Sequence, residues 1–220
     1  MKKALITGAT GMVGRQALNA LLENDAIGEV ISVGRRKTGV VHAKLREIEH
    51  ADFLDLGPLR SQLNGIDLCI YCLGVYQKQV SAEQYVVITC KFQEAMSDLL
   101  QETSPGLTFC LFGAMGADPS GKSRIKFARV KGEAENLLMK TAFPKKYIFR
   151  PGYIHPTGER MPPGIMYKLM KPIGWLALTL FKGSGITDRD LGHSMVKVGL
   201  EGKLPNGVLE NRAIRATLED

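Results

Sequence analysis

Three glycines near the start of the chain, at positions 8, 11 and 14, have the spacing of a turn that holds a pyrophosphate. Such glycines let the backbone turn tightly, approach the phosphates closely and pack the following helix against its strand. An apolar run at 4–6 precedes the turn and a helical pattern follows it, so free N–H groups at the start of the helix face the anion. We therefore predict a nucleotide-binding turn rather than an ordinary connection between a strand and a helix. The ligand contacts expected from it are Gly8, Thr10, Gly11, Met12, Val13 and Gly14.

Two arginines, Arg35 and Arg36, follow the second apolar run of the chain at 29–33. In a fold of parallel strands and crossover helices, the end of the second strand lies beside the adenosine ribose of a bound dinucleotide. A carboxylate there would accept the ribose hydroxyls and repel a 2′-phosphate, whereas guanidinium groups match the geometry of a phosphate. The sequence therefore predicts NADP (NADPH) rather than NAD, with two solvated arginines as the alternative.

Further contacts to this cofactor are expected where later strands end. Asp52 and Phe53 follow a short strand at 45–49. The Asp52 carboxylate either accepts a hydrogen bond from the adenine amine or caps the turn that follows. Asp55 is an alternative residue for that capping role. The remaining contacts are expected at the end of strand four, after strand six and on the helix between strands five and six. They are Cys72, Leu73, Gly74, Lys131, Pro151, Tyr153 and Ile154.

The elements that must position these residues alternate along the chain between strand-length apolar runs and helical periodicity. The expected strands are 4–6, 29–33, 45–49, 67–73, 107–112, 147–150 and 207–210, and the expected helices begin near 12, 81, 124, 188 and 212. Such alternation predicts an α/β fold, a doubly wound parallel sheet of the Rossmann type with the ligand at the carboxyl ends of the strands. We expect residues 1–156 to form the NADP-binding core. Residues 157–220 are expected to form a small substrate or cap region whose last elements return to the same domain.

Length and composition suit a globular protein. The chain has 220 residues, of which 45% are hydrophobic and 23% charged, and no run approaches the roughly 20 apolar residues of a membrane helix. The net charge of +7 is spread along the chain without a basic run between aromatics, so an anionic small molecule accounts for it and no nucleic acid is expected. Lys2 and Lys3 stand directly before the first strand, which leaves no room for a signal peptide, and we expect a cytoplasmic protein.

The chain has four cysteines, at 69, 72, 90 and 110, and the first two have a Cys-x-x-Cys spacing. This spacing is typical of zinc or redox sites. Here it falls inside a buried strand, where residues three apart point to opposite faces of the sheet. We therefore expect four reduced core cysteines and no metal site.

Six short motifs are informative as a set. They are Thr-Gly-Ala-Thr-Gly-x-x-Gly at 7–14, Gly-Arg-Arg at 34–36, Gly-Ala-Asp at 116–118, Val-Lys-Gly-Glu at 130–133, Arg-Pro-Gly at 150–152 and Asn-Arg-Ala-Ile at 211–214. In this order, and over nearly the whole chain, they resemble the short-chain dehydrogenase/reductase superfamily. The resemblance is to its atypical branch, which includes Tat-interacting oxidoreductase-like proteins and NmrA-like NADP sensors.

The resemblance implies an NADP-binding oxidoreductase-like protein with an altered reaction site. Active members of the superfamily use a Tyr-x-x-x-Lys helix, in which the tyrosine transfers a proton, and a serine after strand five. In this chain Phe127 stands at the tyrosine position and Gly113 or Ala114 at the serine position, while Lys131 is retained. Phenylalanine has the size of tyrosine without its hydroxyl, so the usual proton relay is absent.

Two residues are candidates for catalysis in its place. Lys131 holds the nicotinamide ribose, acts as a base itself as in the isoflavone-reductase branch that works without the tyrosine, or is a surface lysine of the helix. The alternative is that Tyr153 or His155 enters the site from the loop after strand six, although the setting of His155 is also that of an ordinary loop residue. We take Lys131 and Tyr153 as the catalytic candidates.

The segment 157–185 has a different composition, with an apolar stretch at 165–182 between Lys168, Lys171 and Lys182. It is consistent with a lid over the nicotinamide, a protein-partner or dimer surface, or membrane association. Two functions therefore stay open: an NADP-dependent reductase of an unknown small organic molecule, or a catalytically silent NADP-binding redox sensor that acts through a protein partner.

Overall fold

The computed structural model of the chain describes residues 1–158 and 185–219. In this part of the chain, parallel strands form a seven-stranded sheet with the order β3-β2-β1-β4-β5-β6-β9. The strands are β1 (Lys2–Thr7), β2 (Ile27–Gly34), β3 (Leu45–Glu49), β4 (Leu68–Tyr71), β5 (Thr108–Phe112), β6 (Lys145–Arg150) and β9 (Gly207–Glu210). The strand order reverses between β1 and β4, so a crevice for a ligand is expected at their carboxyl ends. The prediction of a doubly wound parallel sheet is confirmed.

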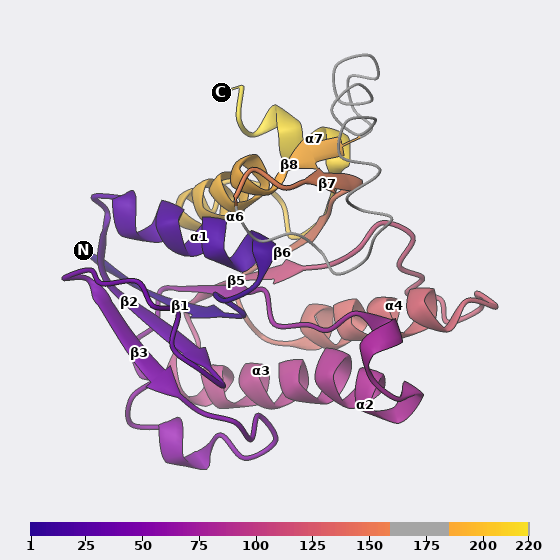
Figure 1. Cartoon of the computed structure of the whole chain (residues 1–220), viewed down its shortest axis with the longest axis horizontal. Coiled ribbons are helices and arrows are strands. Elements are labelled where there is room, and N and C mark those ends of the chain that lie inside the picture. The colour runs from indigo at the N-terminus through magenta and orange to yellow at the C-terminus, as the bar shows by residue number, and fades with distance from the viewer. Residues whose placement is uncertain (159–184, 220) are drawn as a thin grey trace.

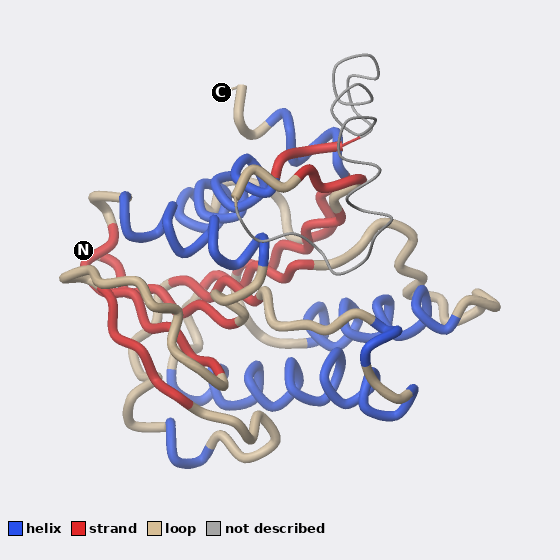
Figure 2. The backbone as a smooth tube through the Cα atoms, in the orientation of Figure 1, coloured by secondary structure: helices blue, strands red, loops and turns tan. Residues whose placement is uncertain are grey.

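Helices cover both faces of this sheet (Figure 1). On one face lie α1 (Met12–Glu23) and α6 (Asp188–Glu201), with α7 (Asn211–Ala216) beside them. On the other face lie α3 (Phe92–Thr103) and α4 (Lys126–Lys140). Figure 2 shows the strands as one layer between these two helical layers.

Side chains of each strand alternate between two apolar clusters, as the two-residue period of a strand requires. Ala4 and Ile6 pack with α1 and α6, whereas Leu5 packs in the second cluster with α3. Cys69 belongs to the α3 side and Cys72 to the α1 side, and both are free thiols. The prediction that these two cysteines point to opposite faces is confirmed.

The helix expected at 81–100 is interrupted. Ser81 and Gln84 form a capping box at the start of α2 (Ala82–Val86), a π-helical turn follows at Val87–Lys91 (η3), and α3 continues from there. The expectation of one regular helix is therefore wrong. A π turn inserts an extra residue and changes the register of the helix, which hydrophobic periodicity alone does not predict. Short 3-10 helices, η1 (Gly57–Leu59) and η2 (Gln77–Gln79), lie in the connecting loops.

Two short strands form a second parallel sheet, β7 (Tyr153–His155) with β8 (Gly185–Thr187). The sequence predicted a loop here, because three-residue strands carry too little periodicity to be seen. The Thr187 hydroxyl caps α6 by accepting from the backbone N–H of Asp190 at 3.0 Å, which confirms the expected cap. The predictions for 165–182, including the lid and the membrane contact, lie outside the described residues. Within the described ranges, no helix combines the length and apolarity needed to cross a membrane.

Candidate functional site

The glycine turn packs directly on the end of β4. Gly8 has a φ of +71°, and a Cβ placed there would lie 2.4 Å from the carbonyl oxygen of Cys72. A Cβ on Gly14 would lie 2.2 Å from the carbonyl oxygen of Gly8. Neither position accepts a side chain without moving backbone, so both glycines are required by the turn itself. The structure therefore brings the turn and the predicted contacts at Cys72 and Leu73 together.

The N-terminus of α1 is open at this turn. Its N-cap is Gly11, and among the described residues no side chain caps it and no acid stands in its first turn. The predicted contacts Met12 and Val13 are the first two residues of this helix. Uncapped backbone N–H groups and the positive end of the helix dipole favour an anion at this position.

Arg35 and Arg36 lie on the surface directly after β2. In the described part of the chain they form no hydrogen bond or ion pair. The loop that carries them is held at Thr38, whose carbonyl oxygen accepts from the guanidinium of Arg15. Sequence reasoning missed Arg15, although it directly follows Gly14 and lies in the first turn of α1, beside the glycine turn.

Asp52 and Phe53 both have structural roles. The Asp52 carboxylate accepts from the backbone N–H of Leu54 at 2.9 Å and so caps a turn, which is one of its two predicted roles. Phe53 is buried and stacks on Phe92 with the ring centroids 5.6 Å apart. Asp55 accepts from the N–H of Gly57 at 3.1 Å, at the start of η1.

Lys131 lies on the face of α4 that looks toward the end of β4. Burial lowers its pKa, and the nearby Glu135 carboxylate offsets part of this effect. Burial also raises the pKa of Cys72 to about 12, against the opposing influence of Lys131. Lys131 and Cys72 thus lie close enough to influence each other, and the thiol stays protonated near neutral pH. The predicted cofactor contacts on α4 and β4 converge here.

Glu135, one helical turn after Lys131, is buried and tied to β6. Its carboxylate accepts from Arg150 Nε at 2.9 Å and from Nη2 of the same guanidinium. Arg150 also donates to Glu210 of β9 at 3.0 Å. A Cβ on Gly113 would lie 3.0 Å from Glu135 Oε1, so the end of β5 leaves little room for a serine. The bonds to Glu135 raise the pKa of Arg150 further above its ordinary value.

Phe127 fills the tyrosine position with packing alone. Its ring stacks on Tyr85 of α2, with the centroids 6.4 Å apart and the planes 22° apart. Burial raises the pKa of Tyr85 to about 12, which keeps its hydroxyl protonated. This ring pair joins α2 to the start of α4 and supplies no proton donor at Phe127 itself.

The second catalytic candidate, Tyr153, is the first residue of β7. Its ring lies 6.4 Å from that of His155, and burial raises the pKa of Tyr153. The preceding loop is held by the N–H of Gly152, which donates to Asn211 at 3.0 Å. Pro151 is buried and Ile154 is half-buried. The short sheet thus gives the residues after β6 a fixed backbone.

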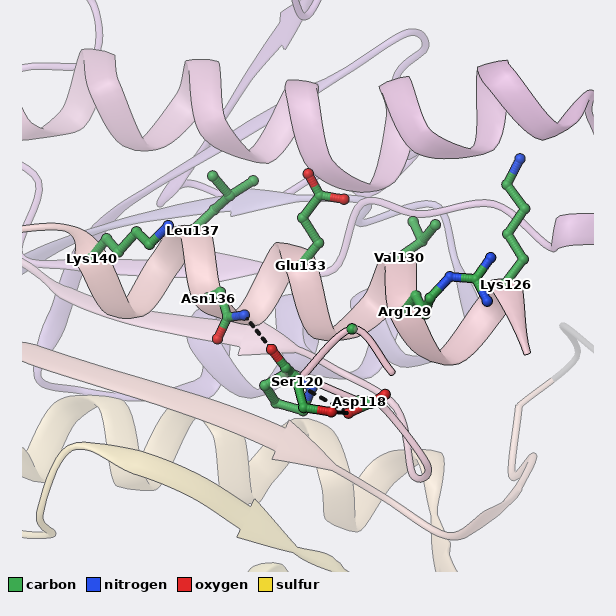
Figure 3. A pocket seen from close by; sticks show the side chains of 11 residues that line it. Asp118, Ser120, Lys126, Arg129, Val130, Glu133, Asn136, Leu137 and Lys140 are labelled. Carbon is green, nitrogen blue, oxygen red and sulfur yellow. Dashed lines mark hydrogen bonds between the residues drawn. The ribbon is translucent and has the colours of Figure 1, made fainter. Parts of the chain in front are cut away.

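A surface cavity of about 470 Å³ lies beside α4 (Figure 3). It is lined by α4 and by the loop at 118–121, and its charged residues include Lys126, Arg129 and Glu133. These side chains are on the opposite side of α4 from Lys131. The cavity is therefore separate from the candidate cofactor site.

The parallel sheet, the glycine turn at its switch point and the lysine on α4 define a Rossmann-type α/β protein of the short-chain dehydrogenase/reductase kind. The model of the NAD dependent epimerase/dehydratase family matches residues 4–124, more than half of the sequence. The chain belongs to this family, and the predicted superfamily is confirmed.

Named relatives cover most of the chain. Protein HTATIP2 of Rattus norvegicus is 27% identical over 165 residues, which are 74% of this chain and 67% of the relative. Protein FMP52, mitochondrial, of Candida albicans is 28% identical over 218 residues, which are 95% of this chain and 92% of the relative. The Bordetella bronchiseptica enzyme WbmH, solved in complex with NAD+, has a TM-score of 0.70 at 17% identity and covers 96% of this chain and 75% of its own. This structural likeness shows the fold.

The expectation of a cytoplasmic protein is contradicted by the fungal relatives. Those of Candida albicans, Coccidioides immitis and Emericella nidulans are all named mitochondrial. The expectation rested on the lack of a secretory signal peptide, and that criterion does not distinguish the cytosol from an organelle.

Proposed function

We propose that this chain binds NADP(H) along the carboxyl ends of β1, β2 and β4 and acts as an NADP-dependent oxidoreductase on a small organic molecule. The observation that carries the proposal is a pair of exposed arginines beside the uncapped N-terminus of α1. These arginines, Arg35 and Arg36, form no hydrogen bond or ion pair within the described residues. Two such arginines match a 2′-phosphate, and the N–H groups of α1 match a pyrophosphate. This donor set fits NADP better than NAD.

Each part of the site then has a physical task. Gly8, Gly11 and Gly14 let the backbone approach the pyrophosphate, and Lys131 holds the nicotinamide ribose through its ammonium group. Bound NADPH supplies the hydride, so the protein has to position its donor carbon and exclude water. Tyr153, on the short sheet after β6, is the proposed proton donor. In this scheme residues 1–156 bind the cofactor, and residues 157–220 complete the substrate side.

Fluorescence titration of the purified protein with NADPH and with NADH tests the cofactor. We expect NADPH to bind more tightly, because hydrogen bonds to a charged group contribute about 1.5–3 kcal/mol each. Arg35→Ala should then weaken NADPH by about tenfold to a hundredfold and leave NADH nearly unchanged. The control is Arg60→Ala, which removes an exposed arginine that pairs with Glu102. Equal affinity of the wild-type protein for both cofactors would overturn the assignment.

A second function is favoured by Phe127. Its ring is held by Tyr85 in a packed pair, so the site keeps the shape of the family while lacking the usual hydroxyl. A catalytically silent NADP-binding sensor is consistent with that arrangement. NADPH oxidation with a panel of aldehydes, ketones, enones and quinones separates the two functions. Turnover that depends on Lys131 supports the oxidoreductase, and tight NADPH binding without turnover of any of these classes supports the sensor.

A further inference from the structure

Both backbone polar groups of Thr38 are bound by side chains from other elements. Its N–H donates to Glu47 Oε1 of β3 at 2.6 Å, and its carbonyl oxygen accepts from Nη2 of Arg15 in α1. Its own hydroxyl accepts from the N–H of Val40 at 3.1 Å. Thr38 is 8% exposed, although the three residues before it are exposed. This residue is therefore a fixed point in a surface loop.

The other end of the same loop is also fixed. The carbonyl oxygen of Gly34, the last residue of β2, accepts from the N–H of His50 at 2.9 Å. Arg35 and Arg36 thus lie between two anchored residues, Gly34 and Thr38. A loop of this length that is held at both ends has few conformations to lose when its side chains bind an anion.

We propose that Arg15 and Glu47 are positioning residues that set the preference of this site for a phosphorylated over an unphosphorylated dinucleotide. The inference rests on the proposed binding of NADP(H) and adds the residues that control its specificity. Arg15 and Glu47 act through the backbone of Thr38. By holding that backbone they keep the guanidinium of Arg35 where the 2′-phosphate lies, and so reduce the entropy cost of binding. NADH has no 2′-phosphate, so its affinity does not depend on this loop.

Two other roles would leave different signatures. If Arg15 contacts the phosphate directly, its removal weakens NADPH binding while removal of Glu47 does not. If both residues only stabilise the fold, their removal weakens NADPH and NADH alike. The positioning role predicts a selective loss of NADPH affinity from both changes.

The experiment measures the dissociation constants of NADPH and NADH, with the melting temperature, for Arg15→Ala and Glu47→Ala in the full chain. We expect each variant to bind NADPH about five- to tenfold more weakly and NADH within about twofold of wild type. Arg15→Lys retains a donor for the Thr38 carbonyl, and Glu47→Gln retains an acceptor for its N–H. Both should restore most of the preference. The controls are Arg60→Ala and Glu102→Ala, which break an exposed ion pair elsewhere.

The outcomes separate this inference from the cofactor assignment. Equal wild-type affinities for NADPH and NADH overturn the NADP assignment and the inference with it. A wild-type preference that Arg35→Ala removes, but that Arg15→Ala and Glu47→Ala leave intact, overturns the inference alone. A loss of the NADPH preference in the Arg15 variant alone also overturns the inference. So does an equal loss of affinity for NADPH and NADH in both variants. If an alanine variant does not fold, the conservative variants decide: a normal preference in both supports the inference, and a lost preference with an unchanged melting temperature overturns it.

Discussion

At the edge of the sheet where the parallel strands end, two regions are built in opposite ways. At the first end, over β1 and β2, backbone groups and exposed charges face outward, with an uncapped helix at Gly11 and solvent-exposed guanidinium groups at Arg35 and Arg36. At the second end, over β5 and β6, the charges are buried and already paired, as in the bonds of Glu135 to Arg150. The first end is arranged to receive an anion. The second is arranged to keep its own charged groups satisfied.

This difference explains why the structure supports cofactor binding more directly than catalysis. A bound phosphate needs N–H groups and cations that lack other partners, and the first end offers both. Proton transfer needs a hydroxyl or amine aimed at the reacting atom. At the second end Phe127 offers packing, and Lys131 is the cation of α4 that lies near Cys72.

The largest expected effect is at the second end. Glu135→Gln removes the charge that pairs with Arg150 and leaves a guanidinium partly buried without its main partner, so we expect a loss of about 3–5 kcal/mol in the free energy of unfolding. Urea denaturation followed by circular dichroism measures this loss.

The matched control is Glu210→Gln, because Glu210 binds the same guanidinium and its side chain is 56% exposed. A solvated pair of this kind is worth at most about 1 kcal/mol. Equal losses from both changes would contradict the contrast between a buried and an exposed partner.

The next largest effect is at the first end, where the backbone of the glycine turn packs directly on the end of β4. Gly8→Ala places a Cβ 2.4 Å from a carbonyl oxygen and forces alanine to a φ of +71°. We expect a loss of about 3 kcal/mol or more in the free energy of unfolding, together with loss of NADPH binding.

Gly121→Ala separates the cost of the positive φ from the cost of the close contact with the carbonyl oxygen. Gly121 has the same φ of +71°, and a Cβ there would have no neighbour within 4 Å among the described atoms. This control therefore measures the conformational cost alone, about 1–2 kcal/mol. A Gly8 variant no less stable than the Gly121 variant would show that the turn does not pack tightly on β4.

The features that the sequence predicted depend on local signals. The glycine turn is set by the spacing of three residues. The strands β3 and β9 have the predicted bounds. The helix cap at Thr187 follows from a threonine that precedes an acidic first turn.

The features that the sequence did not predict depend on contacts between distant residues or on changes of register. The π turn at Val87–Lys91 changes the helix register between Tyr85 and Met96, both of which are buried. The pairing of β7 with β8 joins segments about 30 residues apart in the chain. The partner of Glu135 lies on another element, and so does the Thr38 carbonyl that Arg15 binds. No local pattern specifies which of several charged residues will meet.

The smallest expected effect concerns Lys131, on α4 at the second end. Because burial lowers its pKa, the ammonium loses its proton at a lower pH than an ordinary lysine, whose pKa is about 10.4. If this ammonium holds the cofactor ribose, NADPH affinity should fall as the pH rises through the lowered pKa, by about tenfold in total. Titrations over the alkaline range, with the same series for Lys131→Met and Lys131→Arg, measure the fall.

Wild type, Lys131→Met and Lys131→Arg should differ in how their NADPH affinity depends on pH. Lys131→Met lacks the charge at every pH, so its affinity should be weak and should lack the fall that wild type shows. Lys131→Arg keeps its charge throughout the range and should also lack that fall. The folding of the apo chain should respond with the opposite sign. Between the lowered folded pKa and the ordinary value, the unfolded chain binds more protons at this lysine than the folded one, so its contribution to stability rises with pH. A wild-type stability profile that matches that of Lys131→Met would show that the lysine is solvated, and would place it outside the paired, buried end of the sheet.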